Sequence, residues 1–119
     1  MNNDIEGKGT YVWSDKRQFT GDWVANKMHG HGVFIWSDGR RYEGAYYNDK
    51  KSGTGIFSWP DGRRYEGEWL SGRQHGIGNY TNTQDQTQKG EWFEGRRVRW
   101  FPKNESEEDV KGGENDTPK

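Results

Sequence analysis

Histidine and carboxylate side chains are the residues of this sequence that could bind a metal ion or move a proton. His29, His31 and His75 are the three histidines, and the chain contains no cysteine. Because a structural zinc site usually takes four ligands, mostly cysteine and histidine, the sequence predicts neither a metal site nor a cofactor. His29 and His75 occupy equivalent positions two repeats apart, so no serine–histidine–aspartate triad is indicated. We therefore expect no catalytic residue and no enzymatic activity.

Arginines at a fixed spacing of 23 residues are a second set that could do chemistry. They occupy two adjacent positions of the spacing, with Arg17, Arg40 and Arg63 at the first and Arg41 and Arg64 at the second. A line of guanidinium groups along one rim of a sheet would attract anionic lipid headgroups or an acidic partner. The alternative is that these arginines pair with Glu43, Glu66 and Glu68 on neighbouring strands.

The composition excludes several other functions. Of the 119 residues, only 27% are hydrophobic while 15% are aromatic, and 18 are glycine, so most apolar surface comes from rings. That length has room for one domain. No apolar run reaches membrane-spanning length, and the first residues show no signal peptide, which favours a cytoplasmic protein. The first 104 residues carry a net charge of about +3, which is too small to favour nucleic acid as a ligand.

The elements that must position these side chains are copies of one repeat. Residues 65–78 read YEGEWLSGRQHGIG, and the same pattern begins at Tyr42 and at Phe19 and returns in weaker form at Gln88. In this register the aromatic residues form four columns: Phe19, Tyr42 and Tyr65; Trp23, Tyr46, Trp69 and Trp92; Tyr11, Phe34, Phe57 and Tyr80; Trp13, Trp36 and Trp59.

Each repeat alternates with period two, which predicts strands, and no helical period occurs. Turns are predicted within repeats at Asn26, Asp49, Gly72 and Gly95, and between repeats at the Asp-Gly pairs 38–39 and 61–62. The prediction is an all-β fold, an elongated single-layer antiparallel meander of stacked β-hairpins, with about eight strands from residues 9–14 to residues 88–93. The rings share a face with glycines, and a Cβ atom there would lift each ring from the neighbouring backbone.

The predicted organisation has three parts. Residues 1–6 are a lead, residues 7–101 are the repeat array, and residues 102–119 are an acidic tail that we expect to be disordered. The array divides into a half repeat at 7–18, repeats that begin at residues 19, 42 and 65, and a partial repeat from residue 88. The half repeat suggests a fragment of a longer array.

The copies FTGDWVANKMHGHG, YEGAYYNDKKSGTG and YEGEWLSGRQHGIG resemble MORN (membrane occupation and recognition nexus) repeats over about residues 7–95. Departures from that pattern are Lys16, Ser52 and Gln88, which stand for a glycine, a histidine and an aromatic residue. The resemblance implies stacked hairpins in one layer, and a scaffolding or membrane-proximal role, often with partner proteins in the grooves. It also implies hosts such as lipid kinases, or locations at the cytoskeleton, the cilium or the inner face of a membrane.

The sequence leaves three functions open. The first is a non-catalytic scaffold that binds a helical or extended segment of another protein, and we also consider a homodimer. The second is peripheral binding of anionic phospholipid, such as a phosphoinositide, through the arginines named above. The third is a regulatory segment of a larger enzyme such as a lipid kinase. The candidate groove residues for the first are Trp13, Trp23, Phe34, Trp36, Tyr42, Tyr46, Phe57, Trp59, Tyr65, Trp69 and Trp92.

Overall fold

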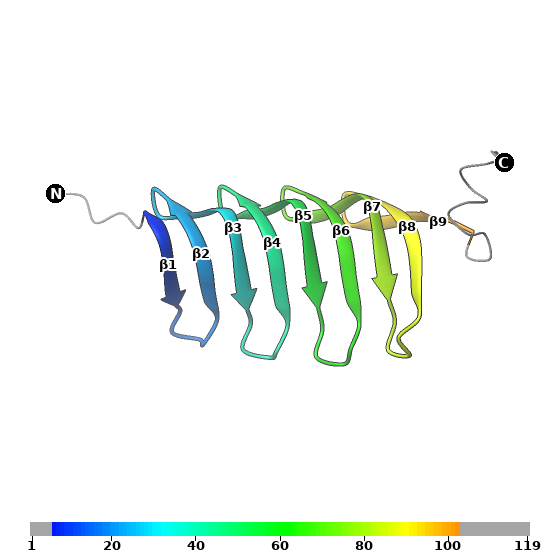
Figure 1. The fold of residues 1–119 in the computed structure, drawn as a ribbon, viewed down its shortest axis with the longest axis horizontal. Helices are drawn as coiled ribbons and strands as arrows, with labels where there is room; N and C mark the ends of the chain where they lie inside the picture. The colour runs from blue at the N-terminus through cyan, green and yellow to red at the C-terminus, as the bar shows by residue number, and fades with distance from the viewer. Residues whose placement is uncertain (1–5, 103–119) are drawn as a thin grey trace.

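A computed structural model describes residues 6–102 of the chain, which form nine strands in one antiparallel sheet. Strands that follow one another along the chain are neighbours in the sheet, so the hairpins lie side by side along the long axis (Figure 1). The strands are β1 (Gly7–Val12), β2 (Gln18–Val24), β3 (Lys27–Ile35), β4 (Arg41–Tyr47), β5 (Lys50–Ser58), β6 (Arg64–Leu70), β7 (Arg73–Thr81), β8 (Thr87–Phe93) and β9 (Arg96–Trp100). The predicted all-β meander in a single layer is confirmed.

The described residues contain no helix, and so none long and apolar enough to cross a membrane. The predicted acidic tail lies outside the described residues, apart from Pro102 at its start.

The prediction of about eight strands was wrong by one strand, because it ended the sheet at β8. The segment Arg96–Trp100 shows no alternation of aromatic residues and glycines, so its sequence did not indicate a strand. It pairs with β8 nonetheless, with Gly90 opposite Trp100. Backbone hydrogen bonds to β8 decide the conformation of β9 where side-chain pattern does not.

Rings pack over a ladder of glycines that crosses the sheet from strand to strand. Gly44 faces Gly55 on the next strand, and the Tyr42 ring covers both of them. A Cβ atom on Gly44 would lie 2.8 Å from the Tyr42 hydroxyl and even nearer to the backbone of β5. Phe19 and Tyr65 cover the equivalent pairs, and these three rings are the most buried side chains. The expected packing of ring on glycine is therefore confirmed.

The C-terminal end of the ladder uses a ring from outside the repeat pattern. Gln88 stands where the other repeats have a covering ring, so that position of β8 supplies no ring over Gly90. Trp100 on β9 takes this role, because a Cβ atom on Gly90 would lie 3.0 Å from its ring. Its ring also packs against Trp92, with centroids 5.9 Å apart.

The turns within repeats, which form the upper edge of Figure 1, have two central residues with positive φ. Asn48 and Asp49 have φ values of 48° and 71°, and Ser71 and Gly72 have values of 51° and 86°. This conformation defines the type I′ turn, whose twist matches that of the flanking strands. We call these four turns, at residues 25–26, 48–49, 71–72 and 94–95, the hairpin tips.

The turns between repeats have three-residue loops. Trp36 N–H donates to the Arg40 carbonyl, and Gly39 N–H donates to the Trp36 carbonyl. Gly39 has a φ of 98°, a left-handed conformation that glycine adopts without steric cost. Asp38 fixes the loop because its carboxylate accepts the Arg40 N–H at 3.1 Å.

Each repeat also contains a β-bulge next to the His-Gly pair or its equivalent. The register of β2 and β3 shifts between Gly21 and Asp22, where Gly30 has a φ of 70°. The Asp22 carboxylate accepts the His31 N–H at 3.0 Å. Glu68 accepts the Ile77 N–H at 2.7 Å in the repeat that begins at residue 65. In the repeat between them the equivalent residue is Ala45, which has no acceptor.

Candidate interaction surfaces

Most of the predicted groove residues are buried in the core and present little accessible ring surface. Eight of the eleven are classed as buried, and the remaining three are partly buried and pack against them. The buried eight are Trp23, Phe34, Tyr42, Tyr46, Phe57, Tyr65, Trp69 and Trp92. These rings form the core beneath the accessible surface of this face of the sheet. The surface that a partner can reach is narrower than the sequence indicated.

The three rings left partly accessible are Trp13, Trp36 and Trp59, which we call the tryptophan row. Trp13 stacks on Phe34 with centroids 5.3 Å apart, and Trp36 lies 5.2 Å from Phe57. Among the described residues none accepts a hydrogen bond from the indole N–H groups of this row. The row therefore offers both ring surface and free donors.

An arginine accompanies each ring of the tryptophan row, and an aspartate pairs with each arginine. Arg40 lies 5.2 Å from the Trp36 ring centroid, and its Nε is 2.9 Å from an Asp38 carboxylate oxygen. Arg17 and Arg63 make the same contacts with their own tryptophan and aspartate. The backbone N–H of the arginine, followed by its guanidinium, lowers the pKa of each of these exposed aspartates. This part of the predicted arginine rim is thus locally paired.

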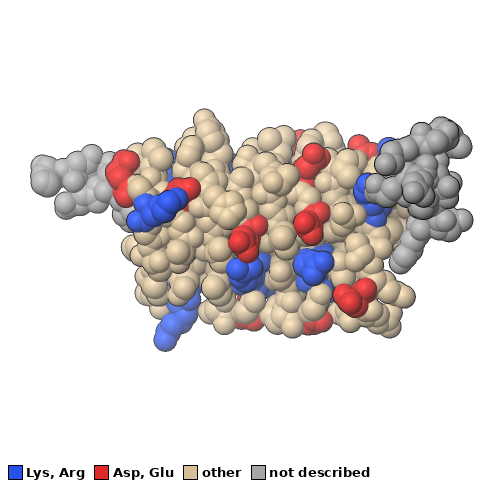
Figure 2. Space-filling model, in the orientation of Figure 1, with Lys and Arg blue, Asp and Glu red and all other residues tan. Residues whose placement is uncertain are grey.

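The second set of rim arginines lies on the other face of the sheet. Arg41 pairs with Glu43 at 3.1 Å, while Arg64 has no ion pair with another residue that the structure describes. Glu68, which we expected to pair with an arginine, instead binds the backbone of the bulge. On the face that Figure 2 shows, basic and acidic side chains lie interspersed. No continuous basic stripe is visible there.

Lys51 is a cation among the rings, at the position that Met28 occupies in the preceding repeat. Its Nζ lies 5.3–5.8 Å from the centroids of four rings, those of Trp36, Tyr42, Phe57 and Trp69. Burial, with a contribution from the nearby Arg40 charge, lowers the pKa of Lys51. Within residues 6–102, no side chain or carbonyl accepts a hydrogen bond from this ammonium group.

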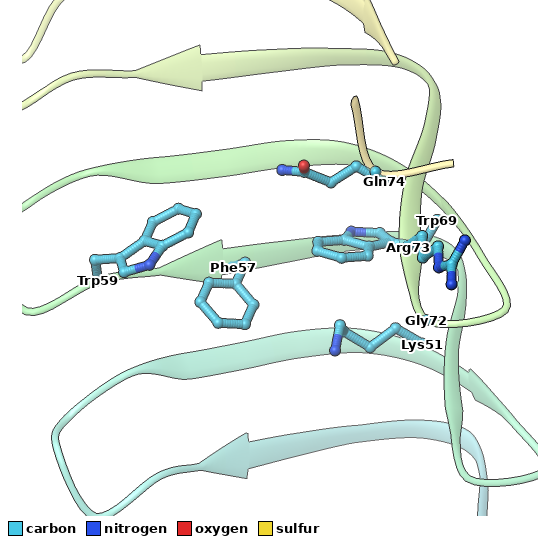
Figure 3. A pocket seen from close by; sticks show the side chains of 8 residues that line it. Lys51, Phe57, Trp59, Trp69, Gly72, Arg73 and Gln74 are labelled. Atoms are coloured by element: carbon cyan, nitrogen blue, oxygen red, sulfur yellow. The ribbon is translucent and has the colours of Figure 1, made fainter. Parts of the chain in front are cut away.

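Lys51 opens onto a hollow of about 270 Å³, shown in Figure 3. Phe57, Trp59 and Trp69 supply its apolar wall, and Gln74 lies across these rings from Lys51. Arg73 also lines the hollow, but its guanidinium points away from Phe57 and Trp59 in this view. We call this feature the Lys51 hollow.

The hairpin tips carry a second surface that was not predicted from the sequence. One apolar side chain and one basic side chain face each other across every tip, and we call these pairs the tip row: Val24 with Lys27, Tyr47 with Lys50, Leu70 with Arg73, and Phe93 with Arg96. The apolar members are 49–61% exposed, which is unusual for large apolar residues repeated in a line. Among the described residues none forms an ion pair with a basic member.

Two histidines have structural roles beside this row. His29 packs against Tyr47 with centroids 5.0 Å apart, and its Nδ1 accepts the Asn48 N–H at 3.4 Å. His75 repeats this arrangement with Phe93 and the N–H of Glu94. Residues 6–102 contain no cluster of three metal-ligating side chains.

The MORN repeat model matches residues 1–16, 19–40, 42–63 and 65–84, which is more than half of the chain. This chain belongs to the MORN-repeat family. Among curated protein sequences, none matches it. MORN repeats are in general non-enzymatic modules that contact proteins or membranes. The family match ends at residue 84, so β8 and β9 extend the MORN array beyond the matched repeats.

The same spacing that revealed the MORN repeat would also have revealed the surfaces that were missed. Residues 24, 47, 70 and 93 are all apolar, and residues 27, 50, 73 and 96 are all basic. A comparison of Met28 with Lys51 at the equivalent position would likewise have singled out the lysine, because the columns around this position are aromatic.

Proposed function

We propose that this MORN array is a non-catalytic scaffold that binds a segment of another protein on its ring-bearing face. The observation that carries the proposal is the tryptophan row beside the Lys51 hollow. Partly exposed tryptophans with arginines stacked on them are the side-chain types that dominate binding energy at protein interfaces. The row and the hollow lie on one continuous hydrogen-bonded sheet, so binding needs little ordering of the scaffold.

An extended strand or an apolar-faced helix fits this face better than a globular surface does. The tryptophans recur once per repeat and form a line across the strands. A linear segment can contact such a line at successive positions, as in other peptide-recognition grooves. A cytoplasmic location, which the family resemblance and composition favour, agrees with this role.

The test is the capture of proteins from a cell extract by the wild-type chain and by matched variants. Trp36→Ala with Trp59→Ala should abolish capture while the circular dichroism spectrum still shows the folded sheet. The control is Arg41→Glu with Arg64→Glu on the opposite face, which should leave capture unchanged. If the control variant loses the same proteins and the tryptophan variant keeps them, the proposal is wrong.

A second candidate is peripheral binding of anionic phospholipid, and the tip row favours it. The apolar residues of this row differ in shape, as do the basic ones, but each position keeps its chemical class. Binding to a fluid lipid surface depends on whether a side chain is apolar or basic and requires no fixed side-chain shape. Apolar side chains enter the interface, and cations contact phosphate groups. The predicted rim arginines suit this role less well, because Asp15, Asp38, Asp61 and Glu43 pair with four of them.

Acidic residues are few at the two central tips. Glu6 accepts the Ala25 N–H at the first tip, and Glu94 lies within the fourth. At the second tip, Asp49 directs a carboxylate oxygen to the Met28 N–H at 2.8 Å. We therefore expect Tyr47 with Lys50, and Leu70 with Arg73, to contribute most.

Flotation with phosphatidylserine vesicles tests this candidate. Leu70→Ser with Arg73→Glu should weaken binding about tenfold or more, since each basic residue near an anionic surface contributes roughly 1 kcal/mol. Arg41→Glu with Arg64→Glu should have a smaller effect. If the Arg41 and Arg64 variant lost more vesicle binding than the Leu70 and Arg73 variant, the lipid site would lie at the predicted arginine rim. Equal binding of the wild-type chain to neutral vesicles would exclude recognition of anionic lipid.

A further inference from the structure

We propose that the Lys51 hollow is a receptor for a carboxylate side chain of the bound segment, with an apolar neighbour of that carboxylate packed on Phe57, Trp59 and Trp69. This inference rests on the proposed binding of a protein segment to the ring-bearing face. It adds the chemical identity of the segment, which is an acidic residue next to an apolar one. It also places the recognition around Lys51, where the repeats that begin at residues 42 and 65 meet.

The unmet hydrogen-bonding capacity of Lys51 is the first argument. An ammonium group has three donors, and none of them reaches an acceptor among residues 6–102. The four rings around Nζ stabilise its charge through their quadrupoles, but a ring accepts no strong hydrogen bond. A carboxylate that enters the hollow would supply both the opposite charge and the acceptors.

The charges around Lys51 select an anion rather than a neutral polar group. Arg40 lies on the same Trp36 ring as Lys51, and its positive charge disfavours the Lys51 ammonium. Asp38 is already paired with the Arg40 guanidinium and N–H. An incoming carboxylate therefore relieves repulsion between two cations and gains a partner in a site of lowered dielectric.

The size of the hollow suits a single side chain. Its volume of about 270 Å³ is below the range of pockets that enclose drug-sized ligands. The walls are Phe57, Trp59 and Trp69 on one side and the polar Gln74 on another, so an apolar group and a polar group can lie side by side. This combination suits an acidic residue with an apolar neighbour in one segment.

The equivalent positions show that only the repeat that begins at residue 42 has a lysine at this place. Met28, Gln74 and Arg97 occupy the sites that correspond to Lys51 in the other repeats. Met28 is a buried member of the core. The matched variant is therefore Lys51→Met, which gives the second repeat the residue that already fits this place in the first.

The experiment selects binders from a phage-displayed library of random peptides on the wild-type chain. We expect selected peptides to contain aspartate or glutamate at a fixed position beside an apolar residue. Lys51→Met should weaken their binding by about tenfold to a hundredfold, the loss of one charge-assisted hydrogen bond, while raising the melting temperature of the free protein. The exposed neighbour gives the control, because Lys50→Met should leave peptide binding within about twofold.

The outcomes separate this inference from the proposed function. Peptides that need Trp36 and Trp59 but contain no acidic residue, or that bind Lys51→Met as tightly as wild type, overturn the carboxylate site and leave the scaffold role intact. Peptides that bind equally well to the Trp36→Ala and Trp59→Ala variant overturn the ring-bearing face as the binding surface. A selection that yields no peptide for this face counts against both.

Discussion

The repeat that begins at Phe19 and the repeat that begins at Tyr42 share a register but differ in how completely their interiors are satisfied. Both have a ring over paired glycines, a type I′ tip and a tryptophan stacked with an arginine. The first repeat fills its interior with Met28, and its Asp22 accepts the bulge N–H of His31. The second has a charged Lys51 among its rings and the acceptor-free Ala45 at its bulge.

The difference indicates where the array gives up stability for function. A charge held among rings without an acceptor is less stable than an apolar side chain of similar length. Departures from local consistency of this kind tend to occur at functional sites. The first repeat therefore serves as an internal reference for structure, and the second repeat is the one we expect to recognise a partner.

The largest expected effect tests what the two repeats share. Gly55→Ala should destabilise the fold by about 3 kcal/mol or more, because its Cβ would collide with the Tyr42 ring. Gly32→Ala should do the same beneath Phe19. Urea unfolding measures both, and the exposed neighbour Thr54→Ala should change the free energy of unfolding by only about 0.5 kcal/mol. Equal losses for Gly55→Ala and Thr54→Ala would contradict the packing of rings on glycine.

Two single substitutions, Lys51→Met and Met28→Lys, test how the difference between the two repeats affects stability. Lys51→Met should raise the free energy of unfolding by about 1–2 kcal/mol, and Met28→Lys should lower it by about 2–4 kcal/mol, because burying a cation without an acceptor is unfavourable. Chemical denaturation of both variants at neutral pH gives these values. A destabilised Lys51→Met variant would mean that the lysine has a structural role that Met28 does not share.

Alkaline pH should destabilise the repeats that begin with Tyr42 and Tyr65 and should not affect the repeat that begins with Phe19. Burial raises the pKa of Tyr65 to about 12 and raises the pKa of Tyr42 as well, whereas Phe19 at the same position does not ionise. The unfolded state ionises near pH 10 while the folded state stays neutral. Each tyrosine therefore contributes stability that is full below pH 10 and is lost as the pH rises toward 12.

The slope of unfolding free energy against pH measures this effect. Above about pH 10 the loss should approach roughly 1 kcal/mol per pH unit for each such tyrosine. Tyr65→Phe should reduce the slope, although it removes the hydrogen bond to the Glu68 carbonyl at 3.0 Å. An unchanged slope in that variant would show that the Tyr65 hydroxyl is not protected in the folded state.

The smallest expected effect concerns the bulge. Ala45→Asp should place a carboxylate near the Thr54 N–H, as Asp22 does for His31 in the first repeat. The melting temperature should rise by a few degrees, because one more backbone donor gains an acceptor. Ala45→Asn is a control of similar shape without the charge and should give less. A fall in melting temperature with both variants would mean that the second bulge differs in geometry from the first.

Local rules explain why much of the fold could be predicted from the sequence. Rings and glycines that alternate along a strand must share a face, and Asn, Asp or Gly at a tip permits positive φ, so the repeat predicts both the sheet and its turns. The burial of each ring was harder to predict. Alternation assigns Trp69 to one face of the sheet but does not show that neighbouring side chains cover it. The strand β9 was missed because Trp100 replaces the absent ring of Gln88 from outside the pattern. The Lys51 hollow was missed because Lys51 stands out only when it is compared with Met28 at the equivalent position of the preceding repeat.

The central claim is that a partner segment binds the ring-bearing face at the second repeat. The most direct measurement is a titration of the seven tryptophan indole N–H signals by NMR with a peptide selected on the wild-type chain. The indole N–H groups of Trp23 and Trp69 already donate to backbone carbonyls, at 3.0 and 3.2 Å. We predict that the signals of Trp36 and Trp59 shift most and that the signal of Trp23 stays in place. Shifts confined to Trp100, or absent from Trp36 and Trp59 at saturation, would contradict the account.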